Sequence, residues 1–248
     1  MRRCGKRKKR SNTKLDAMNN QKGEIITTQE HYLATVEKSL EKVRKIALEC
    51  IVPIVDLSDE YDLKVIGSSI FINYNSRLFL VTASHVIEEN DNKKYFIPCE
   101  KEFMPLGGYT MRVKSNSGSD KHDLLLFAPY DDLLKGMSIF NPIILKDTDI
   151  QKTYGFNENV AVLGYPTSRN RKHRKTIPKF YIQGLMERTA PLQAYKDEKY
   201  STDVNILICF ERENCYTQDF KRTTHPDPHG ISGGGVWRLF GPNDRYSP

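Results

Sequence analysis

Three short motifs place a histidine, an aspartate and a serine in settings that suit acyl transfer. His85 follows an apolar run, Asp123 begins another apolar run, and Ser232 lies within the glycine-rich segment Gly230–Gly235. A serine hydroxyl is a weak nucleophile and needs an adjacent base. An imidazole can take its proton near neutral pH, and a carboxylate can orient that imidazole. We therefore interpret Ser232 as a candidate nucleophile, His85 as a candidate base and Asp123 as a candidate orienting acid.

The glycines around Ser232 add a candidate oxyanion site. They permit a sharp turn in which the backbone N–H groups of Gly230 and Ser232 point toward one spot, and losing one such donor typically costs about 10²–10³ in rate. Each motif alone also fits a structural role, as a glycine turn, a strand-end histidine or a strand-entry acid. His122 alternates to the other face of its strand and is not expected to take part.

The excess of positive charge belongs to one end of the chain. The 248 residues carry 38 basic and 31 acidic side chains, and residues 1–10 alone hold seven of the basic ones. Without those seven, 31 basic residues balance 31 acidic ones, so the body is formally neutral. The composition predicts a disordered basic tail over residues 1–26. Met18 follows the basic run, and a start there would remove the tail.

The cysteines and the hydropathy pattern bear on the compartment. Five cysteines are scattered without a CxxC pair, whereas small secreted domains usually carry a paired disulfide framework. The charged N-terminus is followed by no apolar signal segment, and no run has the length of a membrane span. We expect a cytoplasmic protein without membrane association.

A helix is predicted for residues 27–50. Thr27 and Glu30 fit a capping box, and the helix must end before Pro53. Apolar or small residues then recur three and four apart, at Leu33, Val36, Leu40, Val43, Ala47 and Cys50. This stripe favours a helix packed against its own domain, and a short coiled-coil contact with a protein partner remains the alternative.

The rest of the chain shows short β-type runs separated by turns. The expected strands are Ile51–Val55, Gly67–Asn73, Arg77–Thr82, Lys94–Pro98, Met111–Lys114, Leu124–Phe127, Asn159–Gly164, Lys179–Gly184, Val204–Phe210 and Gly235–Phe240. The segment Asn73–Ser76 is typical of a hairpin turn. Two successive all-β halves suit two small barrels, residues 51–145 with His85 and Asp123 and residues 146–248 with Ser232.

Taken together, the motifs resemble those of the trypsin-like (chymotrypsin-fold) serine peptidases, of bacterial or phage type. Thr82–His85 is similar to their Thr-Ala-x-His block, Asp123 and Leu124 to the Asp-Leu block, and Gly230–Gly234 to the Gly-x-Ser-Gly-Gly block. Val160–Pro166 looks like the Gly-Tyr-Pro strand of many bacterial members. The resemblance covers about residues 50–240. It implies two six-stranded antiparallel barrels and a His85–Asp123–Ser232 triad that hydrolyses peptide bonds without a cofactor.

Two positions depart from the family pattern. Ile231 stands where digestive members carry an acid that captures a newly cut N-terminus, so activation by that ion pair is not available. Ser84 replaces a more usual alanine, and we expect it to have no effect on His85. The stretch His225–His229 helps to wall the substrate pocket in the family, and Asp227 leaves basic specificity open.

Other ligands find weaker support. The two histidines and the acid of His225–His229 suggest a metal, but its prolines prevent one helical face and no fourth ligand is evident, so we expect none. The basic run Arg169–Lys175 fits a solvated hairpin loop, with a phosphate or acidic partner as the alternative. Because no RNA-binding aromatic motif accompanies it, we do not expect a nucleic-acid partner.

The leading hypothesis is thus a serine endopeptidase acting on proteins or peptides. The alternative is a catalytically inactive protease-like module that binds partners through its helix and basic segments. Only sixteen residues follow Ser232. The resemblance implies a further strand there, so we expect an incomplete second barrel whose open edge associates with a partner and limits activity.

Overall fold

The computed structural model describes residues 13–57, 62–87, 94–100, 102–113, 123–147, 155–156, 158–170, 172–173, 180–198, 200–202, 206–210, 215–216, 222–223 and 228–239. The chain divides into two units, residues 1–39 with 240–248 and residues 40–239. All strands that the structure describes belong to the second unit. Residues 1–12, Asp227 with the histidine at 225, and the C-terminal edge at 240–248 lie outside the described residues, together with the expectations placed on them.

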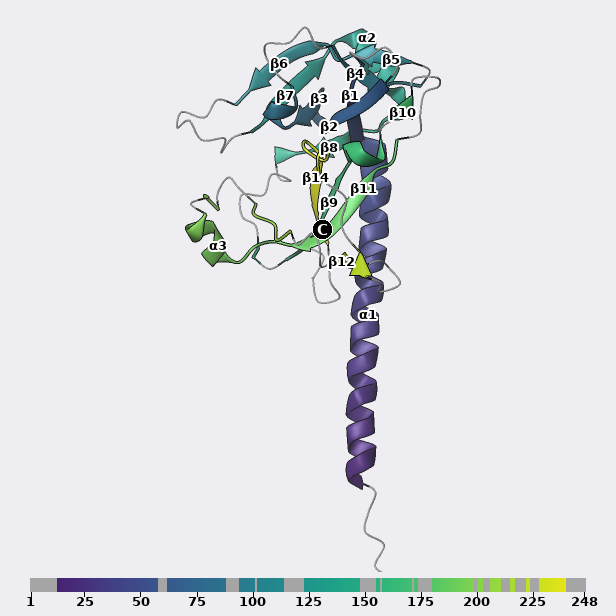
Figure 1. Cartoon of the computed structure of the whole chain (residues 1–248), viewed down its shortest axis with the longest axis vertical. Helices are drawn as coiled ribbons and strands as arrows, with labels where there is room; N and C mark the ends of the chain where they lie inside the picture. The colour runs from purple at the N-terminus through teal and green to yellow at the C-terminus, as the bar shows by residue number, and fades with distance from the viewer. Residues whose placement is uncertain are drawn as a thin grey trace, which may run out of the picture. The chain divides into compact units, whose positions relative to one another are not determined.

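A large, curled and mostly antiparallel sheet is built mainly from the first half of the second unit, and one short strand joins it in parallel (Figure 1). Its strands follow the order β5-β4-β1-β2-β3-β7-β6, and the short strands β8 and β10 also pair with β2. The bounds are β1 (Ile51–Asp56), β2 (Asp62–Tyr74), β3 (Arg77–Thr82), β4 (Tyr95–Pro98), β5 (Phe103–Pro105), β6 (Gly108–Arg112), β7 (Leu125–Pro129), β8 (Ile143–Leu145) and β10 (Lys172–His173). One face of the sheet packs into a single apolar core that includes Val52, Phe71, Leu80, Ile97, Leu125 and Phe127.

A tight turn sets the register of β2 and β3. Asn75 and Ser76 both have positive φ, 50° and 61°, and the flanking pair is Tyr74 opposite Arg77. Positive φ at both central residues of a two-residue loop is the requirement of a type I′ turn, whose twist matches that of the strands. The predicted hairpin is confirmed, and β3 ends as predicted at Thr82, just before His85.

A smaller antiparallel sheet contains β11 (Gln183–Arg188), β9 (Asn159–Gly164) and β14 (Gly235–Arg238), with β9 in the middle. The chain enters β14 directly from the glycine-rich segment, and Gly235 pairs with Leu163. Two short strands, β12 (Cys215–Tyr216) and β13 (Arg222–Thr223), pair with each other. Short helices α2 (Asp131–Gly136) and α3 (Leu192–Asp197) and the 3₁₀ turns η1 (Ser84–Val86), η2 (Met137–Ile139) and η4 (Thr167–Arg169) complete the described elements.

The N-terminal helix is longer than the sequence predicts. The capping box predicts a start at Thr27 and the composition predicts disorder before it, but α1 runs from Thr13 to Cys50. Once a helix is nucleated, each added residue gains one backbone hydrogen bond, so good helix formers extend it beyond a local capping signal. At its C-terminal end Cys50 is buried, and the Asn141 N–H donates to the Glu49 carbonyl at 2.8 Å.

The predicted fold class is confirmed, since one helix precedes two successive antiparallel sheets. The strand count differs: the first sheet has seven strands along its main path, and the described part of the second has three. The strand expected at 179–184 lies at Gln183–Arg188, because its register spans the whole length of β9. Of the strand expected at 204–210, the described residues form only an isolated bridge between Ile208 and Thr189. Whether such a segment forms a strand, and where that strand begins and ends, depends on its pairing partner more than on local hydrophobicity.

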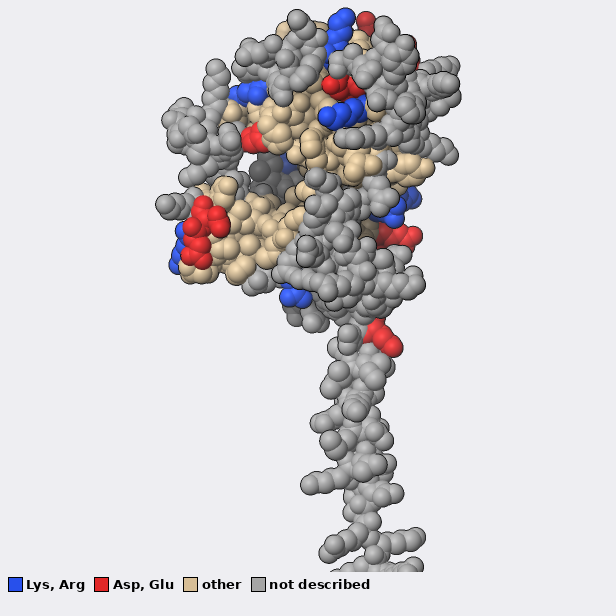
Figure 2. Space-filling model, viewed as in Figure 1, with Lys and Arg blue, Asp and Glu red and all other residues tan. Residues whose placement is uncertain are grey.

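Charge is mixed over the described surface. On the face drawn in Figure 2, the described basic and acidic side chains are interspersed, with a small acidic group beside a basic side chain on the left. This agrees with the formally neutral body that the composition predicts. Of the basic run 169–175, residues 171, 174 and 175 lie outside the described residues.

Candidate active site

His85 lies in the 3₁₀ turn η1, which a single residue, Ala83, separates from the end of β3. Ala83 is extended, and its carbonyl accepts a hydrogen bond from the Val86 N–H at 3.1 Å. Val86 is buried over Gly67 of β2, where an added Cβ would lie 2.8 Å from Val86 Cγ2. The missing side chain at Gly67 therefore lets the turn lie close against the sheet. The His85 side chain stays 60% exposed and accessible to a ligand.

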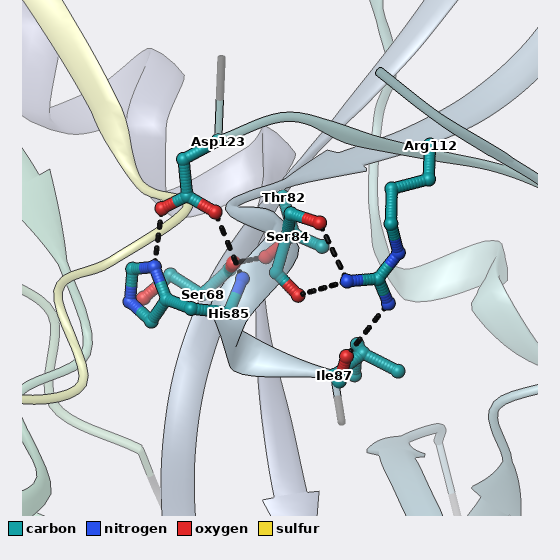
Figure 3. A network of polar contacts seen from close by, with 7 residues as sticks. All are labelled: Ser68, Thr82, Ser84, His85, Ile87, Arg112 and Asp123. Carbon is teal, nitrogen blue, oxygen red and sulfur yellow. Dashed lines mark hydrogen bonds and ion pairs between the residues drawn. The ribbon is translucent and has the colours of Figure 1, made fainter. Parts of the chain in front are cut away.

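Asp123 holds His85 with both carboxylate oxygens (Figure 3). Its Oδ1 accepts a hydrogen bond from the His85 backbone N–H at 2.8 Å, and its Oδ2 contacts the ring Nδ1. The Asp123 carbonyl also accepts from the Ser84 N–H at 3.3 Å. Because Nδ1 faces the carboxylate, Nε2 is the ring nitrogen left to exchange a proton with a hydroxyl, as a general base requires.

The glycine-rich segment forms two successive turns. The Ile231 N–H donates to the Pro228 carbonyl at 2.9 Å, and the Gly234 N–H donates to the Ile231 carbonyl at 2.8 Å. Gly230 and Gly233 occupy the third position of these turns with φ of 92° and 81°. A type II turn requires positive φ at that position, which glycine adopts without a steric penalty. The two glycines are therefore needed for these turns, in which Ser232 is the second residue of the second turn.

Ser68 of β2 ties this segment to the first sheet. Its N–H donates to the Ser232 carbonyl at 2.8 Å, and its hydroxyl donates to the Gly230 carbonyl at 2.9 Å. The same hydroxyl accepts from the Tyr165 N–H at 2.9 Å, while the Ser68 carbonyl accepts from the Thr82 hydroxyl at 2.7 Å. One fully buried serine thus joins the end of β3, the end of β9 and the turns around Ser232.

Gly233 lies in close contact with strand β2 and with the end of strand β3 in the first sheet. A Cβ on Gly233 would meet the Ser68 carbonyl oxygen and the Thr82 hydroxyl, and it would lie 3.0 Å from the Ala83 nitrogen. The residue after Ser232 is therefore packed against the strand end that leads into His85. Among the contacts that the structure describes, His85 and Asp123 are joined directly, whereas Ser232 makes no hydrogen bond to His85.

Ile231 fills the position where the family pattern has an acid. Its side chain is buried, and a Cβ on Gly164 would lie 3.0 Å from both its Cα and its carbonyl oxygen. The Thr167 N–H donates at 2.8 Å to the carbonyl of His229, the second residue of the first turn. Apolar packing and backbone hydrogen bonds thus hold the described segment in place.

The sequence does not predict the contacts of two side chains in this region, Ser68 and Arg112. Ser68 is a polar residue within an otherwise apolar strand, which is a weak signal that it has a buried partner. Arg112 has no such signal. Its guanidinium donates to the Ser84 carbonyl and hydroxyl and to the Ile87 carbonyl (Figure 3). The serine at position 84, expected to be without effect, is thus a direct partner of this arginine.

Within the described ranges, no group of three or more histidine, cysteine or acidic side chains could hold a metal ion. The loop with the histidine at 225 and Asp227 is not among those ranges. No helix in the described part of the chain is both long and apolar enough to cross a membrane.

Comparisons with known proteins give a likeness in structure only. No family model matches the sequence, and no curated protein matches it either. Among solved structures, neuropsin, a serine protease expressed in the limbic system of mouse brain, is similar with a TM-score of 0.44. The match covers 77% of each chain at 11% sequence identity. A likeness of this degree says nothing of residue roles, which depend on the local geometry.

Proposed function

We propose that the protein is a serine endopeptidase acting on proteins or peptides through His85, Asp123 and Ser232. The observation that carries the proposal is that the Asp123 carboxylate binds both the backbone N–H and the ring Nδ1 of His85. In support, Gly233, the residue after Ser232, packs against Ala83 at the strand end that leads into His85, and Ser232 itself belongs to a glycine-containing turn. Side chains of these three types, ordered in this way, suit acyl transfer.

The proposed reaction proceeds through an acyl-enzyme. The Ser232 hydroxyl oxygen attacks the scissile carbonyl carbon while its proton passes to Nε2 of His85. The N–H groups of Gly230 and Ser232 stabilise the negative oxygen of the tetrahedral intermediate. The His85 proton then passes to the leaving amine as the C–N bond breaks. Water attacks the ester, His85 takes its proton and returns it to Ser232, and the acid product leaves.

A fluorophosphonate probe tests the proposal directly. It should phosphonylate Ser232, and mass spectrometry of the labelled peptide should identify that residue. Ser232→Ala should abolish labelling, and His85→Ala should slow it by about 10³-fold or more. Ser138→Ala removes an exposed serine of η2 and is the matched control, expected to label like wild type. A folded wild-type protein that stays unlabelled near neutral pH, beside a control protease that reacts, would refute the proposed activity.

A further inference from the structure

We propose that Arg112 is a positioning residue for His85: it fixes the Ser84–His85 peptide from the side opposite Asp123. The proposal rests on the proposed peptidase function. Arg112 is the last residue of β6 and pairs with Leu125 of β7. Asp123 stands two residues before Leu125, and the Val113 N–H donates to the Leu124 carbonyl at 3.1 Å. A single hairpin end therefore supplies both Asp123 and Arg112 to the turn that carries His85 (Figure 3).

The two side chains hold opposite ends of one peptide group. The carbonyl of that peptide belongs to Ser84 and accepts from Arg112 Nη1 at 3.1 Å. Its N–H belongs to His85 and donates to Asp123 Oδ1 at 2.8 Å. A planar peptide fixed at both its C=O and its N–H cannot rotate about the chain without losing one of these bonds. Its orientation sets the direction in which the His85 side chain leaves the backbone.

Arg112 also fixes the far end of the turn. Its Nη2 donates to the Ile87 carbonyl at 2.8 Å, while Nη1 donates to the Ser84 hydroxyl at 2.6 Å. The guanidinium thus spans η1 from the residue before His85 to the second residue after it. A planar fork with several fixed donors suits two carbonyls and a hydroxyl at once, whereas the lysine ammonium is a point charge on a flexible stem. We therefore expect lysine to replace this arginine poorly.

The consequence concerns the rate of the chemical step more than substrate binding. Arg112 reaches the backbone on the side of the turn away from the Asp123 carboxylate and acts through the His85 backbone. A base displaced by a fraction of an ångström transfers its proton less efficiently, and a misplacement of 1 Å can cost about 100-fold. Loss of Arg112 should therefore lower kcat while KM changes little.

Four variants of the full chain test this with 4-nitrophenyl acetate and the fluorophosphonate probe. Arg112→Met should lower kcat by about 10- to 100-fold and slow labelling of Ser232 in parallel. Arg112→Lys should lie between Arg112→Met and wild type. Ser84→Ala loses one of the three described contacts of Arg112 with the turn and keeps both carbonyl bonds, so it should retain most of the wild-type kcat. The matched control is Arg238→Met, which removes a different arginine, paired with Glu158 at 2.9 Å, and should leave kcat unchanged.

Hydrogen exchange of the His85 amide gives a readout that does not depend on turnover. Arg112→Met should speed exchange of this amide, because the Ser84 carbonyl then keeps only its 3.3 Å bond from the Ile87 N–H beside the Asp123 bond to the His85 N–H, and Arg238→Met should not. Wild-type kcat and wild-type His85 exchange in a folded Arg112→Met protein would overturn the proposal. Should that variant fail to fold, wild-type kcat in Arg112→Lys would overturn it equally. A folded wild-type protein that reacts with neither probe would refute the peptidase function instead.

Discussion

Gly67 and Val86 meet where strand β2 supports the turn that carries His85. An added Cβ at position 67 would lie 2.8 Å from Val86 Cγ2, so Gly67→Ala must displace Val86. Overpacking of this kind typically costs about 1–3 kcal/mol of stability. Because Val86 is the residue after His85, we expect kcat with 4-nitrophenyl acetate to fall as well. Urea unfolding and steady-state kinetics measure the two effects.

The double variant Gly67→Ala/Val86→Ala separates this collision from a general loss of packing. Removing the valine methyl groups makes room for the new Cβ, so the double variant should be more stable than the sum of the two single changes predicts. Residues in contact show coupling of about 0.5–3 kcal/mol. Strictly additive losses of unfolding free energy would mean that the Val86 side chain does not collide with a Cβ at position 67.

At the level of single residues, the sequence predicts that His85 and Asp123 are partners, but it does not predict most of the residues that hold them. The two are recognisable because each stands beside a strand with a strong local pattern, and the structure joins them. Ser68 bonds to Tyr165 and Gly230, which are 97 and 162 residues away, and no local pattern reveals such partners. Arg112 is equally hidden, since its role depends on the β6–β7 register.

Among the elements, α1 allows a sharp test of which face packs on the sheets. Ala47 is fully buried and its neighbour Leu48 is 49% exposed. Ala47→Glu would bury an unpaired charge in a space without room for it, so it should destabilise the protein strongly, by about 3 kcal/mol or more. Leu48→Glu is the matched control and should change the midpoint of urea unfolding little. Equal effects of the two substitutions would contradict this orientation of the helix end.

Some strands are predictable from the local sequence pattern, and others are not. β3 and β9 have the bounds that the sequence predicts, because turn residues or charged residues flank apolar runs. β8 and β10 are short, and each exists as a strand through its pairing with the long strand β2. β-structure depends on neighbours more than on intrinsic preference, so segments of this kind escape a sequence-based prediction.

At the scale of the whole second unit, the end of α1, strand β1 and the segment after β9 meet in one buried place. Cys50 ends the helix, and the Tyr165 hydroxyl donates to the Ile51 carbonyl at 3.2 Å. Burial raises the pKa of the Cys50 thiol from 9.0 to about 12. Burial, with a smaller contribution from Cys50, raises the pKa of the Tyr165 hydroxyl from 10.0 to about 12. Both groups are therefore neutral in the folded protein well into alkaline solution.

These two shifts predict a loss of stability at alkaline pH. In the unfolded chain the thiol and the phenol release their protons near their ordinary pKa values, whereas the folded protein keeps them up to about pH 12. Between those limits the folded state binds more protons, so the free energy of unfolding falls as pH rises, with a limiting slope of about 1.4 kcal/mol per pH unit for each group. The thiol slope begins to fade below its unfolded pKa of 9.0 and is nearly gone about one pH unit lower. Urea unfolding at several pH values should show a shallower alkaline decline in Cys50→Ala and in Tyr165→Phe than in wild type. Cys209→Ala removes an exposed thiol and serves as the control. An alkaline decline of unchanged slope in both core variants would show that neither group stays protonated in the folded state.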